Sequence, residues 1–216
     1  MIKAIIFDLD GTVTNSELLH RRAFNVLLKK YGLSITNKQW RNIFVGAGSR
    51  FIAQWFIQKY KLPEELDDFV DRRRKKYQEL LKKHPLKPIA GFMKFYHALK
   101  RQGFKVAIAS SGHRSNVLAS LRAIGLSRIS VVGIEQVHFS KPNPEIFLKT
   151  AKMLGVKPSA CVVFEDSVPG ITAAKRAKMK VVALLTTTPK ARLKRLEPDI
   201  LIRNYTRLSV STICCL

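Results

Sequence analysis

The sequence predicts an α/β protein with a core of parallel sheet, helices on both sheet faces, and an inserted all-helical domain. Residues 89–216 alternate between short apolar runs and amphipathic stretches of helical period, the pattern of strand–helix units in a parallel sheet. An apolar run at residues 2–7 also has strand character, whereas residues 14–88 carry only helical patterns. We therefore expect the first strand to join the later sheet. The predicted core domain is 1–13 with 89–216, and the predicted helical domain is 14–88.

The inserted segment is predicted to contain three long helices. A helix over 16–31 ends at Gly32, and helices over 49–60 and 63–83 follow the glycine-rich break at 46–48. Pro63 with Glu64 and Glu65 suits the start of the last helix. The basic run 72–76 is interpreted as the solvated face of that helix. Two prolines within 84–88 mark a linker back to the core.

After that linker, strands and helices are predicted to alternate regularly through the core. The expected helices are 91–101, 114–124, 143–154 and 169–179, and the expected strands are 104–109, 129–132, 160–164, 180–185 and 199–202. Asn143 is the predicted N-cap of the third helix, with Pro144 at its first position. A basic tail follows the last strand.

Composition excludes several classes of protein. A chain of 216 residues with 46% hydrophobic residues can bury a sizeable core, and no apolar run of about 18 residues suggests a membrane span. No secretory signal is visible, and three cysteines do not make a disulfide framework, so we expect a cytoplasmic protein. The 39 basic and 15 acidic residues give a net charge of +24. A surface this basic attracts anions, but it could also serve solubility alone. Net charge does not distinguish a role in anion binding from a role in solubility.

Polar residues at the predicted strand ends indicate a site. In open parallel sheets, ligands bind at the carboxyl ends of the strands. Asp8 and Asp10 follow the first strand, and residues i and i+2 of an extended chain point to the same side. Only eight of the 15 acidic residues lie outside the helical segment, and four of them occupy strand ends. The predicted site residues from the core are Asp8, Asp10, Ser110, Ser111, Lys141, Glu165 and Asp166.

This set of side chains suits phosphoryl transfer. Carboxylates are ligands for Mg²⁺, and a carboxylate can also attack phosphorus and carry a covalent aspartyl-phosphate. A neighbouring acid can protonate the leaving oxygen and then deprotonate water. Lys141 would offset negative charge, and the Ser110 hydroxyl can donate to a phosphoryl oxygen. A calcium loop is the alternative for the Asp-x-Asp-Gly sequence, but Thr12 and Val13 do not fit the fifth and sixth positions of an EF-hand loop.

Four motifs resemble those of the haloacid dehalogenase superfamily, whose core is Rossmann-like. They are Asp8-Leu9-Asp10-Gly11-Thr12, Ala109-Ser110, Lys141-Pro142 and Glu165-Asp166-Ser167-Val168-Pro169-Gly170, in the family's order and spacing. The resemblance implies Asp8 as nucleophile and Asp10 as general acid and base. It implies Mg²⁺ held by the Asp8 side chain, the Asp10 backbone carbonyl and Asp166, with Glu165 in support. Ser110 and Lys141 would hold the phosphoryl group, and Asp10 argues against a dehalogenase.

The helical segment resembles the cap of the subfamily that contains β-phosphoglucomutase and phosphoglycolate phosphatase. That resemblance makes His20 and Arg50 candidates for substrate contact, with Gly46-Ala47-Gly48-Ser49-Arg50 as the specificity loop. At the hinge, Asn15 stands where relatives often carry Asp. Without that resemblance, His20 would be interpreted as an ordinary helix residue and Arg50 as a surface charge.

The function we predict is a Mg²⁺-dependent phosphatase that acts on a small phosphorylated metabolite, of the sugar phosphate or phosphoglycolate type. A phosphomutase of the β-phosphoglucomutase type is the first alternative, and it differs only in the acceptor of the phosphoryl group. A basic nucleic-acid-binding protein on this fold is the second alternative. It is disfavoured because the basic residues are spread along the chain without a zinc-finger or RNA-binding motif. We expect no membrane partner, and a monomer or weak dimer.

Overall fold

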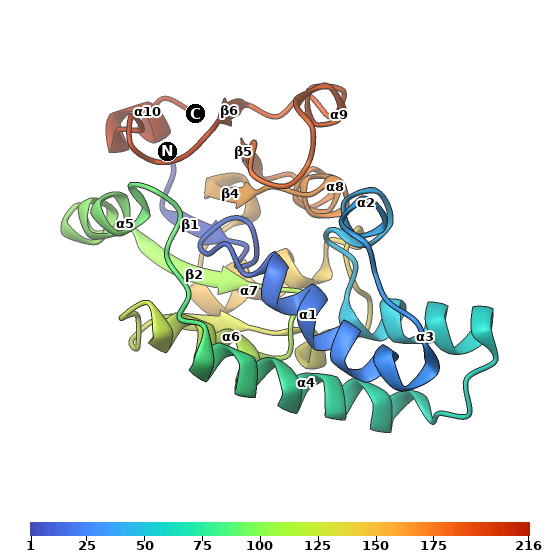
Figure 1. Cartoon of the computed structure of the whole chain (residues 1–216). Helices are drawn as coiled ribbons and strands as arrows, with labels where there is room; N and C mark the ends of the chain where they lie inside the picture. Colours follow the sequence, from blue (N-terminus) through green and yellow to red (C-terminus); the bar gives the residue numbers. More distant parts are fainter.

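The computed structural model describes all 216 residues and contains one parallel sheet of six strands (Figure 1). The strand order is β3-β2-β1-β4-β5-β6, and every neighbouring pair is parallel. The strands are β1 (Ala4–Phe7), β2 (Lys105–Ala109), β3 (Ser130–Val132), β4 (Cys161–Glu165), β5 (Lys180–Leu184) and β6 (Ile200–Ile202). The predicted parallel α/β fold is therefore confirmed.

Strand β1 lies at the centre of the sheet. Its four residues are all buried, as expected for a strand covered on both faces. Ala4 pairs with Lys105 of β2 on one side and with Cys161 of β4 on the other. The carboxyl end of β1 therefore emerges between two other strand ends, which brings distant parts of the sequence to one place.

Two apolar clusters cover the two faces of the sheet. Ile5 and Phe7 of β1 pack in one cluster with α5 (Phe92–Arg101), α6 (Arg114–Ala123) and α10 (Val210–Cys214). The alternate residues Ala4 and Ile6 pack in the other with α7 (Glu145–Leu154), α8 (Val168–Arg176) and α9 (Lys190–Lys194). This alternation follows the two-residue period of a strand.

The segment between β1 and α5 is helical and has an apolar cluster of its own. It contains α1 (Glu17–Leu28), a 3₁₀ turn η1 (Lys29–Tyr31), α2 (Asn37–Gln39), a π-helical turn η2 (Trp40–Phe44), α3 (Ser49–Tyr60) and α4 (Leu66–Lys83). Figure 1 shows α4 running beside α6, one of the helices that cover the sheet, and residues of these two helices are in contact. The Tyr77 hydroxyl and the Ser120 hydroxyl lie 2.8 Å apart there, and Gln78 Nε2 donates to Asn116 Oδ1 at 2.9 Å.

The predicted long helices and strands all form, with ends displaced by at most three residues. The predicted start of α7 is displaced by one residue, since Pro144 and not Asn143 is the N-cap, although Asn143 Oδ1 still accepts the backbone N–H of Glu145. The short helices α2, α9 and α10 were not predicted, because three to five residues are too few to show a helical period. None of the helices is both long enough and apolar enough to traverse a lipid bilayer.

One prediction for the helical segment is wrong. The basic run 72–76 is not uniformly solvated, since Arg73 is only 3% exposed. Its buried neighbours on α4 are Phe69, Tyr77 and Leu81, at the four-residue spacing of one helix face. Arg73 thus lies on the apolar stripe of α4 and points into the protein.

Candidate active site

A small cavity of about 50 Å³ lies between the carboxyl ends of β1 and β4 and the helical segment. Roughly 10–15 Å³ of such volume holds one water molecule, so the cavity has room for only a few waters. Its lining includes seven predicted site residues, namely Asp8, Asp10, His20, Ser111, Lys141, Glu165 and Asp166. The structure therefore brings together residues that are up to 158 positions apart in the sequence.

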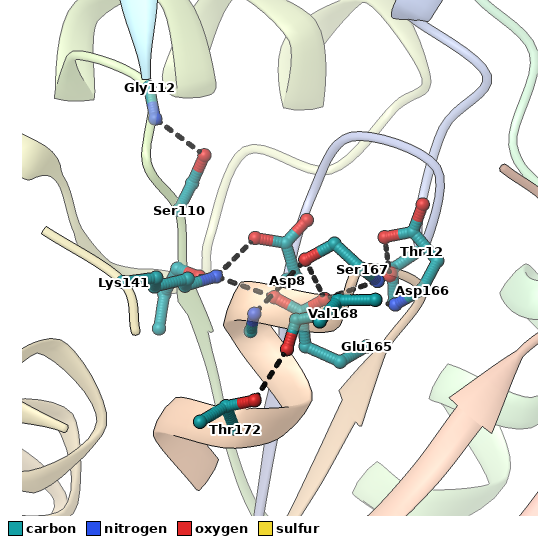
Figure 2. A network of polar contacts seen from close by, with 12 residues as sticks. Asp8, Thr12, Ser110, Gly112, Lys141, Glu165, Asp166, Ser167, Val168 and Thr172 are labelled. Carbon is teal, nitrogen blue, oxygen red and sulfur yellow. Dashed lines mark hydrogen bonds and ion pairs between the residues drawn. The ribbon is translucent and has the colours of Figure 1, made fainter. Parts of the chain in front are cut away.

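Lys141 lies between two carboxylates (Figure 2). Its Nζ is 2.6 Å from Asp8 Oδ1 and 2.7 Å from Glu165 Oε1, and it also donates to the Ala109 carbonyl at 3.2 Å. Burial alone would lower the pKa of Lys141, but the two carboxylates outweigh it and raise that pKa. The ammonium therefore stays charged and points its protons at the oxygen expected to attack phosphorus.

Glu165 is held by four donors. Its Oε2 accepts the backbone N–H groups of Asp166 and Ser167 and the Ser167 hydroxyl, each at 2.9 Å, while Oε1 accepts from Lys141. A side chain at position 170 would collide with this carboxylate, which explains the glycine in the first turn of α8. Glu165 is therefore fixed as the support that positions Lys141.

Asp166 is held by two threonine hydroxyls. Thr12 Oγ1 donates to its Oδ1 at 3.1 Å, and Thr187 Oγ1 contacts its Oδ2. Gly11 has a φ of +82°, and a Cβ there would meet the same carboxylate. The turn after β1 can therefore approach Asp166 only because position 11 is glycine.

Asp10 forms a chain of contacts that reaches into the helical segment. Its Oδ1 accepts from the Ser16 hydroxyl and lies 2.8 Å from His20 Nε2, while His20 Nδ1 contacts Arg73 Nη2. A guanidinium can only donate, so Nδ1 must accept and the His20 proton must sit on Nε2, pointing at Asp10. Burial lowers the pKa of His20, which agrees with a neutral ring.

This chain of contacts holds Asp10 as a carboxylate. Burial alone would raise the pKa of Asp10, but His20, Ser16 and the charge of Arg73 outweigh it and lower that pKa. Arg73 was missed as a site residue in the sequence analysis, because its contact with His20 joins positions 53 residues apart. The available signal was its place on the apolar stripe of α4, where an unpaired arginine is unusual.

We expect Arg73→Met to reduce kcat/KM by about tenfold while leaving the fold intact, because general acid–base steps contribute roughly 10²- to 10⁴-fold and only the orientation of His20 is lost. The guanidinium packs 4.8 Å from the Phe24 ring, and its buried Nε has no hydrogen-bond partner. A methionine of similar length removes that unpaired donor, so the free energy of unfolding should change by less than about 1 kcal/mol. Steady-state kinetics and urea unfolding measure the two effects. A variant that unfolds easily would show that Arg73 serves stability instead.

Glu17 also lines the cavity and was not among the predicted site residues. Its carboxylate accepts from the Trp40 indole N–H. Burial, with repulsion from Asp10, raises the pKa of Glu17 from its ordinary 4.5 to about 7. The folded protein therefore binds this proton more tightly than the unfolded chain does, and ionisation between pH 4.5 and 7 destabilises the fold.

The variant Glu17→Gln is expected to remove this loss of stability. The amide oxygen can still accept from Trp40, so at pH 8 the variant should be more stable than the wild type by at most about 3 kcal/mol. At pH 4 the two should be equally stable. Urea unfolding at both pH values measures the difference, and Glu65→Gln at an exposed position is the control. Equal stability of Glu17→Gln and wild type at pH 8 would contradict the expectation.

Two predicted residues, Ser110 and Arg50, do not line this cavity. Ser110 is buried behind the cavity wall, where its hydroxyl accepts the Gly112 N–H at 3.0 Å, while Ser111 and Gly112 line the cavity. Arg50 does not reach the four acids. It is exposed, pairs with Asp67, and lines a neighbouring cavity of about 610 Å³ instead. The loop 46–49 that precedes it does line the catalytic cavity.

The four acids do not form a ready-made cage for a metal, since no three carboxylate or histidine groups come within ligand distance of a common point. Their chemistry nevertheless fits a divalent cation. Burial raises the pKa values of Asp8 and Asp166, and repulsion from Glu165 adds to both effects. Lys141 forms ion pairs with Asp8 and Glu165, and Asp166 has no cationic partner, so the group carries uncompensated negative charge from oxygen donors of the kind Mg²⁺ prefers.

Comparison with known proteins identifies the family of this site. The family model for haloacid dehalogenase-like hydrolases matches residues 5–184. A phosphorylated carbohydrates phosphatase of Thermotoga maritima is 32% identical and aligns over 82% of each chain. CbbY from Rhodobacter sphaeroides, solved in complex with phosphate, has a TM-score of 0.87 at 26% identity over 97% of each chain.

A longer relative contains a similar sequence as one part of its length. The Arabidopsis thaliana protein SUPPRESSOR OF QUENCHING 1, chloroplastic, is 33% identical over 98% of this chain, which spans only 20% of the length of that protein. The match to the family model covers most of the present chain, including all four motifs that suggested the resemblance. The chain therefore belongs to the haloacid dehalogenase-like hydrolases.

Proposed function

We propose that the chain is a phosphatase that hydrolyses a small phosphorylated metabolite of the sugar phosphate or phosphoglycolate type. The observation that carries this proposal is the buried Asp8 carboxylate, 2.6 Å from Lys141 Nζ in a cavity shared with Asp10 and Asp166. The name of the Thermotoga relative and the phosphate bound to CbbY support the same class of substrate. In this proposal residues 14–88 act as a cap over a core formed by 1–13 and 89–216.

Asp8 is the proposed nucleophile. A carboxylate oxygen of Asp8 forms a bond to phosphorus while the bond from phosphorus to the substrate oxygen breaks, leaving an aspartyl-phosphate. The Lys141 ammonium points at the same oxygen and offsets the charge that builds on the phosphoryl group. Ser111 and Gly112 line the cavity at the next strand end, where phosphoryl oxygens would need donors, whereas the Ser110 hydroxyl lies behind them and would have to turn to reach such an oxygen.

Asp10 is the proposed general acid and base. In the arrangement described here it is a carboxylate that accepts from His20 and Ser16, the form that removes a proton from water when the aspartyl-phosphate is hydrolysed. To protonate the leaving oxygen in the preceding step, Asp10 must first take up a proton. Separation of the cap from the core, which removes His20, would allow this.

Mg²⁺ is the proposed cofactor. Asp8 and Asp166 would hold it, with Glu165 in support through Lys141 and the backbone. The ion supplies charge neutralisation that lets a phosphoryl group approach the acids.

One second candidate is a phosphomutase of the β-phosphoglucomutase type, in which the phosphoryl group passes from Asp8 to a sugar hydroxyl instead of to water. The similarity to a putative β-phosphoglucomutase from Thermotoga maritima, with a TM-score of 0.72 at 27% identity, supports this candidate. Interconversion of β-glucose 1-phosphate and glucose 6-phosphate, with a bisphosphate primer present, tests this candidate.

The phosphatase is tested by phosphate release from a panel of phosphorylated metabolites, with Mg²⁺ or with EDTA. We expect release from at least one sugar phosphate or phosphoglycolate, and none in EDTA. Rapid acid quenching during turnover should yield a peptide phosphorylated at Asp8. Absence of phosphate release from every compound, in a folded protein supplied with Mg²⁺, would reject the phosphatase and leave the mutase assay to decide.

A further inference from the structure

A second cavity, of about 820 Å³, lies between the start of the helical segment and the loop after β5. Its walls come from residues 15–21, from residues 37–45 in α2 and η2, and from residues 185–190, with Arg203 just beyond β6. Glu17 and Trp40 line both this cavity and the catalytic one, and so form part of the wall between them. The four acids of the catalytic site do not line it. We call this cavity the basic cleft.

The basic cleft carries uncompensated positive charge. Arg21, Arg41, Lys190 and Arg203 line it, and none of the four forms an ion pair. Its only carboxylate belongs to Glu17, which faces Trp40. Like charges gathered in one cavity repel one another, so an anion bound there removes an unfavourable interaction.

The neighbouring cavity of about 610 Å³ provides a contrast. It too contains arginines, but Arg50 pairs with Asp67, and Arg74 lies 3.0 Å from Asp71. Basic residues are common on this protein, so their presence alone indicates nothing. The absence of acidic partners is what distinguishes the basic cleft.

The remaining polar lining suits phosphate oxygens. Side-chain amides come from three asparagines of the helical segment, and Thr188 of the loop after β5 adds a hydroxyl, whereas the Thr186 and Thr187 hydroxyl protons are already donated to Gly11 and Asp166. Charge-assisted hydrogen bonds from arginine and lysine to phosphate are among the stronger ones in proteins, and neutral donors complete the shell. A volume of about 820 Å³ lies within the range of sites for small molecules.

We propose that the basic cleft binds a small phosphorylated anion with several charges, of the polyphosphate or nucleotide type, at a site separate from the catalytic one. Arg21 and Arg41 belong to the helical segment, whereas Lys190 and Arg203 belong to the sheet layer, so a bound anion contacts both. The cations come from four segments around one cavity, which favours a compact ligand over a nucleic acid strand.

The loop that lines the basic cleft also reaches the catalytic site. Thr187 contacts the Asp166 carboxylate, and Thr186 Oγ1 donates to the Gly11 carbonyl at 2.6 Å. An anion in the basic cleft would therefore restrain the same loop that holds Asp166. The site itself does not depend on the proposed phosphatase activity.

The proposal is tested by calorimetric titration of inorganic tripolyphosphate into the full chain in EDTA, where no metal-dependent turnover occurs. The cleft variant combines Arg41→Ala, Lys190→Ala and Arg203→Ala. Because it removes three charge-assisted contacts, its affinity should fall by about tenfold or more. The control variant combines Lys94→Ala, Lys100→Ala and Arg101→Ala, which removes the same charge from exposed positions at α5. Its affinity should remain within about twofold of wild type, since those residues lie outside the basic cleft.

Three results would overturn the proposal. The cleft variant could bind tripolyphosphate as tightly as wild type, or both variants could weaken equally, which would show an effect of net charge alone. A short single-stranded oligonucleotide could bind more tightly than tripolyphosphate and lose affinity in both variants, which would indicate an extended nucleic-acid surface. The three substituted cleft residues are exposed, and thermal unfolding of each variant verifies that the fold is kept. Because the readout is binding in EDTA, failure here is distinct from failure of the phosphatase assay.

Discussion

Replacement of Asp8 by asparagine is expected to reduce phosphate release by about 10⁴-fold or more, because loss of a covalent nucleophile removes the reaction path itself. The amide has nearly the same shape as the carboxylate but cannot form the acyl phosphate. No phosphorylated peptide should be recovered from the quenched variant. Initial rates with the best substrate, measured at saturating Mg²⁺, give the size of the effect.

The fold of this variant should survive. Burial already raises the pKa of Asp8, which means that the folded protein holds its negative charge unfavourably. A neutral side chain at this position therefore adds no buried charge, although Lys141 keeps only Glu165 as an anionic partner. Asp68→Asn, at an exposed position on α4, is the matched control and should retain full activity. Retention of wild-type activity by Asp8→Asn would eliminate the mechanism.

Replacement of Lys141 by methionine is expected to reduce both activity and stability. Loss of the cation that faces the attacking oxygen should lower kcat by roughly 10²- to 10³-fold, the range seen when one stabilising donor is removed. Asp8 and Glu165 would then remain buried without their shared partner, which should lower the free energy of unfolding by roughly 3–5 kcal/mol. Kinetics and urea unfolding report the two effects separately.

A double variant separates the two effects of Lys141. In Lys141→Met combined with Glu165→Gln, one of the unpaired carboxylates is neutral, so part of the lost stability should return. Activity should not return, because the donor to the phosphoryl group is still missing. If the double variant were no more stable than Lys141→Met alone, Lys141 and Glu165 would not form the coupled pair that their 2.7 Å separation indicates.

The sequence predicted the sheet and the ends of its strands because both depend on local patterns. Asp8 and Glu165 follow runs of apolar residues that are typical of buried strands, and parallel strands present their carboxyl ends at one edge of the sheet. The order of the motifs then placed Lys141 near both. The convergence of these core residues required no knowledge of the helical segment, which supplies the other wall of the cavity.

The contributions of the helical segment could not be predicted in the same way. The contact of Arg73 with His20 and that of Glu17 with Trp40 join different helices, and their existence depends on how α1, α4 and η2 pack. The charges of residues 72–76 suggest a solvated helix face. Only the four-residue spacing of Arg73 from Phe69 and Tyr77 indicates that this one side chain is buried. Thr187 likewise reaches Asp166 from a loop whose path no local pattern fixes.

The central place of β1 has a consequence for the synthesis of the protein. Strand β1 leaves the ribosome before both of its partners, because it pairs with β2 about a hundred residues later and with β4 still later, at the register of Ala4 with Cys161. Until then its backbone and its side chains have no permanent partners in the chain. Contacts this distant in sequence slow folding and leave an exposed strand open to aggregation. We therefore expect nascent chains that end before β4 to be sensitive to proteases and to bind chaperones.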